Sequence, residues 1–285
     1  MAVMERGARS VEVGFGQCWH LRSFTSSSSA LPTIVGLHGF SGTGADFQSL
    51  QHLMPANWLC PDILGHGESD APEDPAAYTM SCVASQLARL LADEVAGPYV
   101  LMGYSMGARL ALSAVLGELA AGVPRPRPER LILIGGRPGL RGAEERLARQ
   151  RADTELAGRI EEQGAEWFAE YWSKRPILGS QQQIAALERQ RIQTARREQR
   201  PHGLAGSLRG MGAGAMPSLW SRLSGLTVPT TLVTGTRDPK FSEIASEMAR
   251  IVPRAQHLQV QNAGHTAHLE RPAHFAELVR FALDA

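Results

Sequence analysis

The 285-residue chain has few cysteines, no excess of either charge and no long uncharged apolar run. Its three cysteines, Cys18, Cys60 and Cys82, are widely spaced and odd in number, which argues against a disulfide framework or a zinc site and fits a reducing cytoplasm. Basic residues number 29 and acidic residues 28, which gives a net charge of +1. No global field therefore favours nucleic acid or an anionic membrane, and an anionic ligand must be attracted locally.

Targeting and membrane signals are also missing from the sequence. The stretch "MAVMERGARS" has no apolar segment after its charges, as a secretory signal would. No uncharged run approaches the roughly 20 residues that span a bilayer. We therefore expect a cytoplasmic protein with no membrane segment, no nucleic-acid partner and no metal or other cofactor. The sequence leaves the oligomeric state open and is compatible with a monomer.

Short β-rich runs alternate with helical patterns along most of the chain. Residues 11–24 indicate an opening strand pair, and a polar turn is expected at 26–29. This alternation predicts an α/β fold with a mostly parallel central sheet, flanked by helices, whose ligands bind at the carboxyl ends of the strands. The predicted strands lie at 33–39, 57–62, 99–103, 130–136, 230–235 and 257–262, and the helices around 80–96, 106–121, 240–251 and 271–283.

The alternation stops between the fourth and fifth of these strands. Residues 138–217 contain no convincing strand and are rich in arginine, glutamate, glutamine and alanine. We predict a helical cap over the strand ends at 138–217, inserted into a core made of residues 1–137 and 218–285.

A serine lies on the turn between the predicted strand at 99–103 and the helix that follows. Ser105 sits between Gly103 and Gly107 in a Gly-x-Ser-x-Gly pattern, which is typical of a nucleophile elbow. The glycines suit a turn so sharp that a Cβ would collide with the crossing chain. The turn places the hydroxyl at a helix N-terminus, where free N–H groups favour a developing anion.

A serine hydroxyl needs an imidazole to take its proton and a carboxylate to orient that imidazole. Asp238 follows one predicted strand and His265 follows the last one, in the chain order serine, acid, histidine that this kind of fold uses. His268 is a weaker candidate, because it falls in the next polar turn, and His66 is interpreted as structural. We therefore predict that Ser105, Asp238 and His265 form a catalytic triad.

Two backbone N–H groups are needed to hold the oxyanion that such a triad generates. One is expected from Met106, directly after the serine. The other is expected from Phe40 in the loop "LHGFSG" after the first central strand.

These motifs resemble the α/β-hydrolase superfamily over the whole chain. From about residue 34 to residue 272, the sequence is similar more narrowly to the 2-succinyl-6-hydroxy-2,4-cyclohexadiene-1-carboxylate synthase family of menaquinone biosynthesis. The stretches that carry this resemblance are "LHGFSG", "GYSMGAR", "GGRPGLRGAEERLARQRAD", "SLRGMG", "TRDPKF" and "AGHTAHLERP".

The resemblance implies a lyase that removes pyruvate from 2-succinyl-5-enolpyruvyl-6-hydroxy-3-cyclohexene-1-carboxylate. In this reading Ser105 takes a proton from carbon, the oxyanion hole holds the succinyl carbonyl oxygen, and no acyl-enzyme forms. The same triad would also serve a serine esterase or a carbon–carbon bond hydrolase, in which Ser105 attacks as a nucleophile. An arginine-rich cap favours the lyase, because an esterase for neutral lipids would need an apolar one.

A substrate with three carboxylates calls for planar, bidentate donors in the cleft. Arg109 lies one turn beyond Ser105 in an otherwise apolar helix and is expected to face the same cavity. The resemblance implies further substrate-binding residues in Arg149, in Arg196 or Arg197 with Arg196 preferred, in Trp172 and in Tyr104. Arg137 either binds a carboxylate or is only a surface charge.

Overall fold

The computed structural model describes residues 4–25 and 31–284, so the turn expected at 26–29 lies outside the described residues. The described strands form one sheet in the order β1-β2-β4-β3-β5-β6-β7-β8. β1 pairs with β2, and β2 with β4, in antiparallel fashion, while the other neighbours are parallel. The prediction of a mostly parallel sheet is confirmed. The strands are β1 (Met4–Glu12), β2 (Cys18–Thr25), β3 (Thr33–Leu37), β4 (Asn57–Pro61), β5 (Tyr99–Tyr104), β6 (Arg130–Ile134), β7 (Thr230–Gly235) and β8 (Ala255–Val260).

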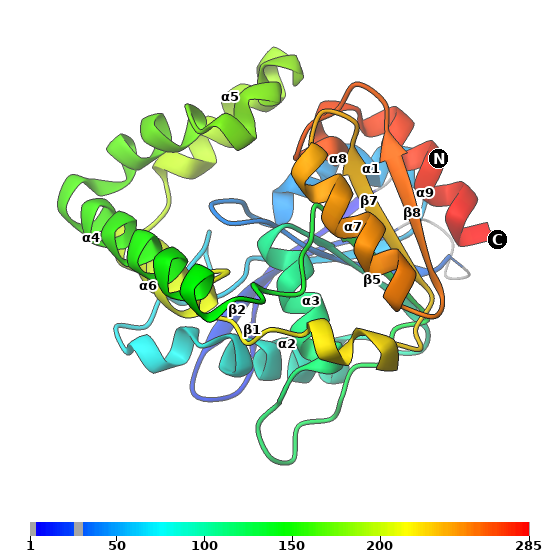
Figure 1. Ribbon diagram of the computed structural model, residues 1–285, viewed down its shortest axis with the longest axis horizontal. Coiled ribbons are helices and arrows are strands. Elements are labelled where there is room, and N and C mark those ends of the chain that lie inside the picture. Colours follow the sequence, from blue (N-terminus) through cyan, green and yellow to red (C-terminus); the bar gives the residue numbers. More distant parts are fainter. Residues whose placement is uncertain (1–3, 26–30, 285) are drawn as a thin grey trace.

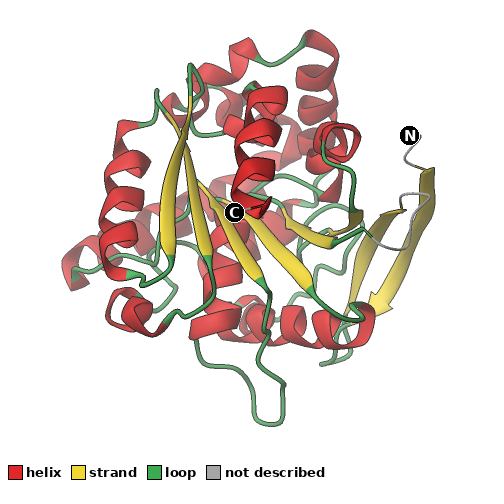
Figure 2. Ribbon diagram, turned by 90° about the vertical axis from the view of Figure 1, so that its right-hand side faces the viewer, coloured by secondary structure: helices red, strands yellow, loops and turns green. Residues whose placement is uncertain are grey.

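Helices cover both faces of this sheet (Figure 2). Alternating side chains of each central strand enter opposite cores: in β5, Leu101 packs with α2, α3 and α7, whereas Val100 and Met102 pack with α1 and α9. Because both faces are buried, the strand is apolar along its whole length rather than alternating. The helices are α1 (Gln48–Leu53), α2 (Met80–Glu94), α3 (Met106–Leu116), α4 (Ala143–Ser173), α5 (Ala186–Arg197), α6 (Pro201–Met211), α7 (Pro239–Ile251), α8 (Ala267–Glu270) and α9 (Pro272–Asp284).

The helix predicted around 106–121 is shorter than expected and ends at Leu116. Gly117 has extended backbone angles, and a Cβ there would lie 2.4 Å from the Ser113 carbonyl oxygen. The guanidinium of Arg125 donates hydrogen bonds to the carbonyls of Val115 (2.7 Å) and Gly117 (2.9 Å). A side chain from the loop after the helix therefore satisfies its last carbonyls, which helical periodicity does not reveal.

Between β6 and β7 the described chain contains helices and no strand, as predicted. α4, α5 and α6 gather on one side of the molecule, opposite α7 and α9 (Figure 1). α4 is broken at Gly164, whose φ of 83° and ψ of 177° leave the helical region. None of the helices in the described part of the chain is long and apolar enough to cross a membrane. We refer to α4, α5, α6 and the 3-10 segment Pro176–Gln183 together as the cap helices.

Candidate active site

Ser105 occupies a strained turn between β5 and α3. Its φ of 49° and ψ of −100° lie outside the ordinary regions for a residue with a side chain. A Cβ on Gly103 would lie 2.5 Å from the Gly107 carbonyl oxygen, and one on Gly107 would lie 2.1 Å from the Leu37 carbonyl oxygen. Only glycine therefore fits on either side of the serine, and the tight turn aims the hydroxyl away from the sheet.

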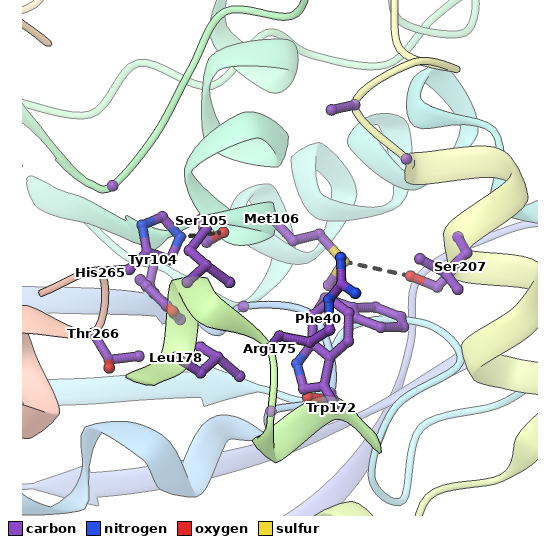
Figure 3. Close-up of a pocket in the computed structure, with 18 of the residues that line it drawn as sticks. Phe40, Tyr104, Ser105, Met106, Trp172, Arg175, Leu178, Ser207, His265 and Thr266 are labelled. Atoms are coloured by element: carbon purple, nitrogen blue, oxygen red, sulfur yellow. Dashed lines mark hydrogen bonds between the residues drawn. The ribbon is translucent and has the colours of Figure 1, made fainter. Parts of the chain in front are cut away.

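The structure brings the three residues of the predicted triad together, and Figure 3 shows two of them, Ser105 and His265. His265 Nε2 lies 3.1 Å from Ser105 Oγ, and His265 Nδ1 lies 2.7 Å from Asp238 Oδ2. The other oxygen of Asp238 accepts a hydrogen bond from the backbone N–H of Phe241 at 3.3 Å, at the N-terminus of α7. Because an ionised carboxylate only accepts, Nδ1 carries the imidazole proton and Nε2 is left to accept from the serine hydroxyl.

The loop after β3 lies beside the serine. Gly39, Phe40 and Met106 line the same cavity as Ser105. Met106 is the first residue of α3, and the first N–H groups of a helix have no acceptor within it. His38 holds the loop: its Nδ1 lies 2.8 Å from the Gly39 carbonyl oxygen, and its Nε2 accepts from the backbone N–H of Ile63 at 2.8 Å. These two bonds require a neutral ring, and burial lowers the pKa of His38 accordingly.

A cavity of about 580 Å³ opens between the triad and the cap helices. Among the described residues that line it, seven carry a positive charge and three a negative one, so the cavity is strongly cationic although the chain is almost neutral. A space of this size holds a small organic ligand. The cationic residues are Arg109, Arg137, Arg149, Arg159, Arg175, Arg196 and Lys240, and the acidic ones are Asp46, Asp153 and Glu155.

Two of these arginines, Arg109 and Arg149, lie near one buried carboxylate, that of Asp153. Arg109 is partly buried, and burial together with Arg149 and Arg137 lowers the pKa of Arg109 to about 9, against the opposing charge of Asp153. The single Nε–H of Arg149, one helical turn away in α4, donates a bifurcated hydrogen bond to the two oxygens of Asp153, at 2.9 and 3.0 Å. The sequence left open whether Arg137 binds a carboxylate or is only a surface charge. Its side chain is 13% exposed, so it is not a surface charge. Two guanidiniums beside one buried carboxylate leave this end of the cavity suited to bind an anion.

The structure separates Arg196 from Arg197. Arg196 is 4% exposed, lines the cavity and donates to Gln181 Oε1 at 3.2 Å, and its Nε and Nη1 have no partner among the described residues. Arg197 is 46% exposed and pairs with Glu166 at 2.9 Å. Burial lowers the pKa of Arg196, so a bound anion would stabilise its charge.

The two aromatic residues that the resemblance named also line the cavity. Trp172 of α4 packs edge-on against Phe40, with ring centroids 5.2 Å apart (Figure 3). Trp172 also stacks on Phe168, at a centroid distance of 5.6 Å. Tyr104 is buried beside the imidazole of His265, at a centroid distance of 5.4 Å. Trp172 therefore joins the cap to the loop that carries Phe40.

His268 differs from the expectation that it lies in a polar turn. It is fully buried in α8, with Tyr104 at 4.6 Å and Phe47 at 5.7 Å between ring centroids. The helix α8 begins directly after the loop that carries His265, so His268 lies in a helix and not in a turn. The aromatic side chains around His268 exclude water. His66, interpreted as structural, packs edge-on against Phe40 at 5.7 Å.

Sequence reasoning missed two arginines at the cavity. The Arg159 guanidinium lies 4.6 Å from the ring centroid of Trp167 and 5.1 Å from that of Tyr171, and Arg175 donates to the Tyr171 hydroxyl at 3.1 Å. The available signal was the pair Trp167 and Tyr171, which follow Arg159 by eight and twelve residues, with Tyr171 four residues before Arg175. Asp153, which is four residues from Arg149, could have been found in the same way.

Metal ligands and reactive thiols would come from the histidine, cysteine and acidic residues that the structure describes. The described residues contain no group of three histidine, cysteine, aspartate or glutamate side chains suited to a metal ion. Cys18, Cys60 and Cys82 are free thiols. Burial raises the pKa of the Cys60 thiol to about 12, which keeps it unreactive.

The alpha/beta hydrolase family profile matches residues 34–278, and the chain belongs to this family. A Bacillus subtilis (strain 168) protein is 38% identical over 255 residues, which cover 88% of this chain and 90% of that one; it is named "Putative 2-succinyl-6-hydroxy-2,4-cyclohexadiene-1-carboxylate synthase". A Citrobacter koseri protein named for the same synthase, without that qualifier, is 32% identical and covers 85% of this chain and 90% of its own length.

Among solved structures, MenH from S. aureus superimposes with a TM-score of 0.85 at 29% identity, over 93% of this chain and 97% of that chain. A thermophilic esterase from Thermogutta terrifontis superimposes with a TM-score of 0.78 at 24% identity, over 98% of both chains, and this likeness shows the fold alone. The chain thus has the α/β-hydrolase fold predicted from its sequence.

Proposed function

We propose that this protein is a lyase that eliminates pyruvate from 2-succinyl-5-enolpyruvyl-6-hydroxy-3-cyclohexene-1-carboxylate to give 2-succinyl-6-hydroxy-2,4-cyclohexadiene-1-carboxylate. The observation that carries the proposal is the cationic cavity above the serine, in which guanidiniums outnumber carboxylates. Relatives at 38% and 32% identity over most of the chain are named for this synthase. A substrate with three carboxylates matches the charge of the cavity.

Ser105 would act as the base in this elimination. His265 takes the hydroxyl proton through Nε2, and Asp238 stabilises the resulting imidazolium through Nδ1. The serine oxygen removes the proton from ring carbon 2, next to the succinyl carbonyl. The electrons of that C–H bond form the 2,3 double bond, the ring double bond moves to 4,5, and the bond from carbon 5 to the enolpyruvyl oxygen breaks. Pyruvate leaves as its enolate and takes up a proton.

The charge that builds on the succinyl carbonyl oxygen would be stabilised by an oxyanion hole. The backbone N–H groups of Phe40 and Met106 are the proposed donors, because both residues line the cavity beside Ser105. An imidazole alone is a weak base toward a carbon acid. Stabilisation of the enolate in the oxyanion hole therefore lowers the barrier for removal of the carbon-bound proton by the serine oxygen.

The substrate carboxylates would bind to the arginines of the cavity. Arg109 from α3 and Arg149 from α4 would together hold one substrate carboxylate. Both lie near Asp153, whose single negative charge balances only one of these two guanidiniums. Arg196 from α5 would bind another with its unpaired Nε and Nη1. Tyr104 and Trp172 would form the apolar walls between them.

We further propose that residues 138–217 act as a cap on a core formed by 1–137 and 218–285. Helices of this segment supply Arg149, Trp172 and Arg196 to the cavity, while the core supplies the triad. A substrate would therefore be bound between two parts of the chain, which excludes water from the reacting atoms. The free thiols support a reducing cytoplasm as the place where the enzyme works.

The decisive experiment follows pyruvate release from freshly prepared cyclohexene substrate in a coupled lactate dehydrogenase assay. We expect catalytic release by the wild-type chain and none by Ser105→Ala. p-Nitrophenyl acetate provides the test of a serine esterase. A burst of nitrophenol that vanishes in Ser105→Ala, with no pyruvate formed from the cyclohexene substrate, would overturn the lyase in favour of a hydrolase.

A further inference from the structure

Glu270 is a buried carboxylate that the proposed mechanism does not use. It is 3% exposed, although it lies only five residues after the histidine of the triad. Its two oxygens accept four hydrogen bonds: Oε2 from the Gly264 backbone N–H (2.7 Å), and Oε1 from the Thr266 N–H (3.2 Å), the Thr266 hydroxyl (2.7 Å) and the Ser180 hydroxyl (2.8 Å). A carboxylate can be buried this deeply because each of its partners donates a hydrogen bond to it.

Two of these partners are the chain neighbours of His265. Gly264 and Thr266 flank the histidine in the loop between β8 and α8, and Glu270 binds the backbone N–H of both. The catalytic loop is thereby closed onto the helix that follows it. The backbone on each side of the imidazole is held by one rigid carboxylate.

The fourth partner comes from the cap helices. Ser180 lies in the 3-10 segment Pro176–Gln183, and a Cβ on Gly264 would lie only 2.0 Å from its hydroxyl oxygen. Nearby, Arg271 donates to Gln183 Oε1 at 2.8 Å, which ties the same segment to the core a second time. The segment Pro176–Gln183 therefore contacts the catalytic loop through Glu270.

We propose that Glu270 is a positioning residue, which holds the His265 imidazole in line between Ser105 and Asp238 and couples that position to the docking of cap segment Pro176–Gln183. This inference rests on the proposed function. Four donors require a carboxylate, because a glutamine side chain offers one oxygen and would turn its amide NH₂ toward at least one of the donors. Glu270→Gln thus keeps the volume and breaks the arrangement.

The test combines kinetics with histidine NMR. We expect Glu270→Gln to lower kcat for pyruvate release about 10- to 100-fold, because small displacements of a catalytic group have such effects. KM should change little, since Glu270 does not line the cavity. In ¹⁵N-histidine-labelled protein, the wild-type His265 ring should show the Nδ1–H tautomer, and Glu270→Gln should show an average of the two tautomers. The resonances are assigned with His265→Gln.

Ser180→Ala separates the cap contact from the loop contacts. It should lower kcat only roughly 2- to 5-fold, because the other three donors still hold the Glu270 carboxylate. Because Ser180 would act through Glu270, the double variant should be no slower than Glu270→Gln alone. Additive losses would show that the cap segment is not coupled to the histidine through this carboxylate, and would overturn that part of the proposal.

Asp62→Asn is the matched control for a purely structural role. Asp62 is also buried and accepts two backbone bonds, from Gly44 (2.7 Å) and Glu68 (3.0 Å), but it does not bind a neighbour of the triad. The Asp62→Asn variant should be less stable than the wild type but should keep the wild-type kcat and the wild-type tautomer of His265. Folded Glu270→Gln with wild-type kcat and tautomer would overturn the proposal. If the wild type released no pyruvate, the function would fail instead, and the NMR comparison would still decide the role of Glu270.

Discussion

Arg196 and Arg197 are neighbours in α5, yet only Arg196 lies at the cavity above Ser105. Arg196 is 4% exposed, whereas Arg197 is 46% exposed and pairs with Glu166 of α4. Adjacent residues of a helix point about 100° apart, so burial of one face leaves the next residue in solvent. This pair therefore supplies a test of the cavity in which chemistry and helix position are matched.

Arg196→Gln is expected to weaken substrate binding, and Arg197→Gln to leave it unchanged. The first removes a charge-assisted bond to a carboxylate, worth about 1.5–3 kcal/mol, which corresponds to roughly a 10- to 150-fold loss in kcat/KM. The second removes only a surface ion pair. Steady-state pyruvate release measures both. Equal losses, or a larger loss in Arg197→Gln, would contradict the assignment of Arg196 to the substrate.

Ser105→Ala and His265→Ala should each reduce pyruvate release by about 10²- to 10⁴-fold or more, because either change removes the base. Ser113→Ala is the control. Ser113 is a buried serine of α3, the helix that follows Ser105, and it is not among the described residues that line the cavity. It should turn over like the wild type. Circular dichroism checks that all three variants fold. An active Ser105→Ala would show that another group removes the proton.

Arg109→Ala should raise KM and lower kcat while leaving the fold intact. Arg109 donates to the Met211 carbonyl and Met216 Sδ, but its charge is disfavoured by burial, so its loss costs the free enzyme little. A bound carboxylate would lose one charge-assisted bond, worth about 1.5–3 kcal/mol. Arg222→Ala, which removes a surface pair with Glu118, is the control. Wild-type kinetics in Arg109→Ala would contradict the assignment of Arg109 to a substrate carboxylate.

His268 should make the protein less stable in acid. Burial, with a smaller effect of His265, lowers its pKa from 6.5 to about 3. The unfolded chain therefore binds a proton below pH 6.5 that the folded chain does not, and unfolding free energy falls as the pH drops from 6.5 toward 3. His268→Leu should remove this contribution, which amounts to about 2 kcal/mol between pH 6.5 and 5. Urea unfolding of both proteins at pH 8 and pH 5 measures it, and an identical pH dependence would contradict the prediction.

Sequence pattern was sufficient for the sheet and for the elbow. Hydrophobic runs such as Tyr99–Tyr104 and the two glycines around Ser105 act over a few residues, so their effect is visible locally. The end of α3 was not visible, because Arg125 satisfies its last carbonyls from the loop that follows, outside the helical repeat. The burial of His268 was missed for a similar reason, since the rings around it come from β5, α9 and the 3-10 segment Gly44–Phe47.

The sequence by itself determined the order of strands and helices, the turn that carries Ser105 and the residue types available for catalysis. The tertiary structure alone decided which arginines face the cavity, that Asp153 lies near Arg109 and Arg149, and that Glu270 joins the loop of His265 to Ser180. The physical reason is that periodicity reports only which face of an element is apolar. Which distant side chain then meets that face depends on how the elements pack.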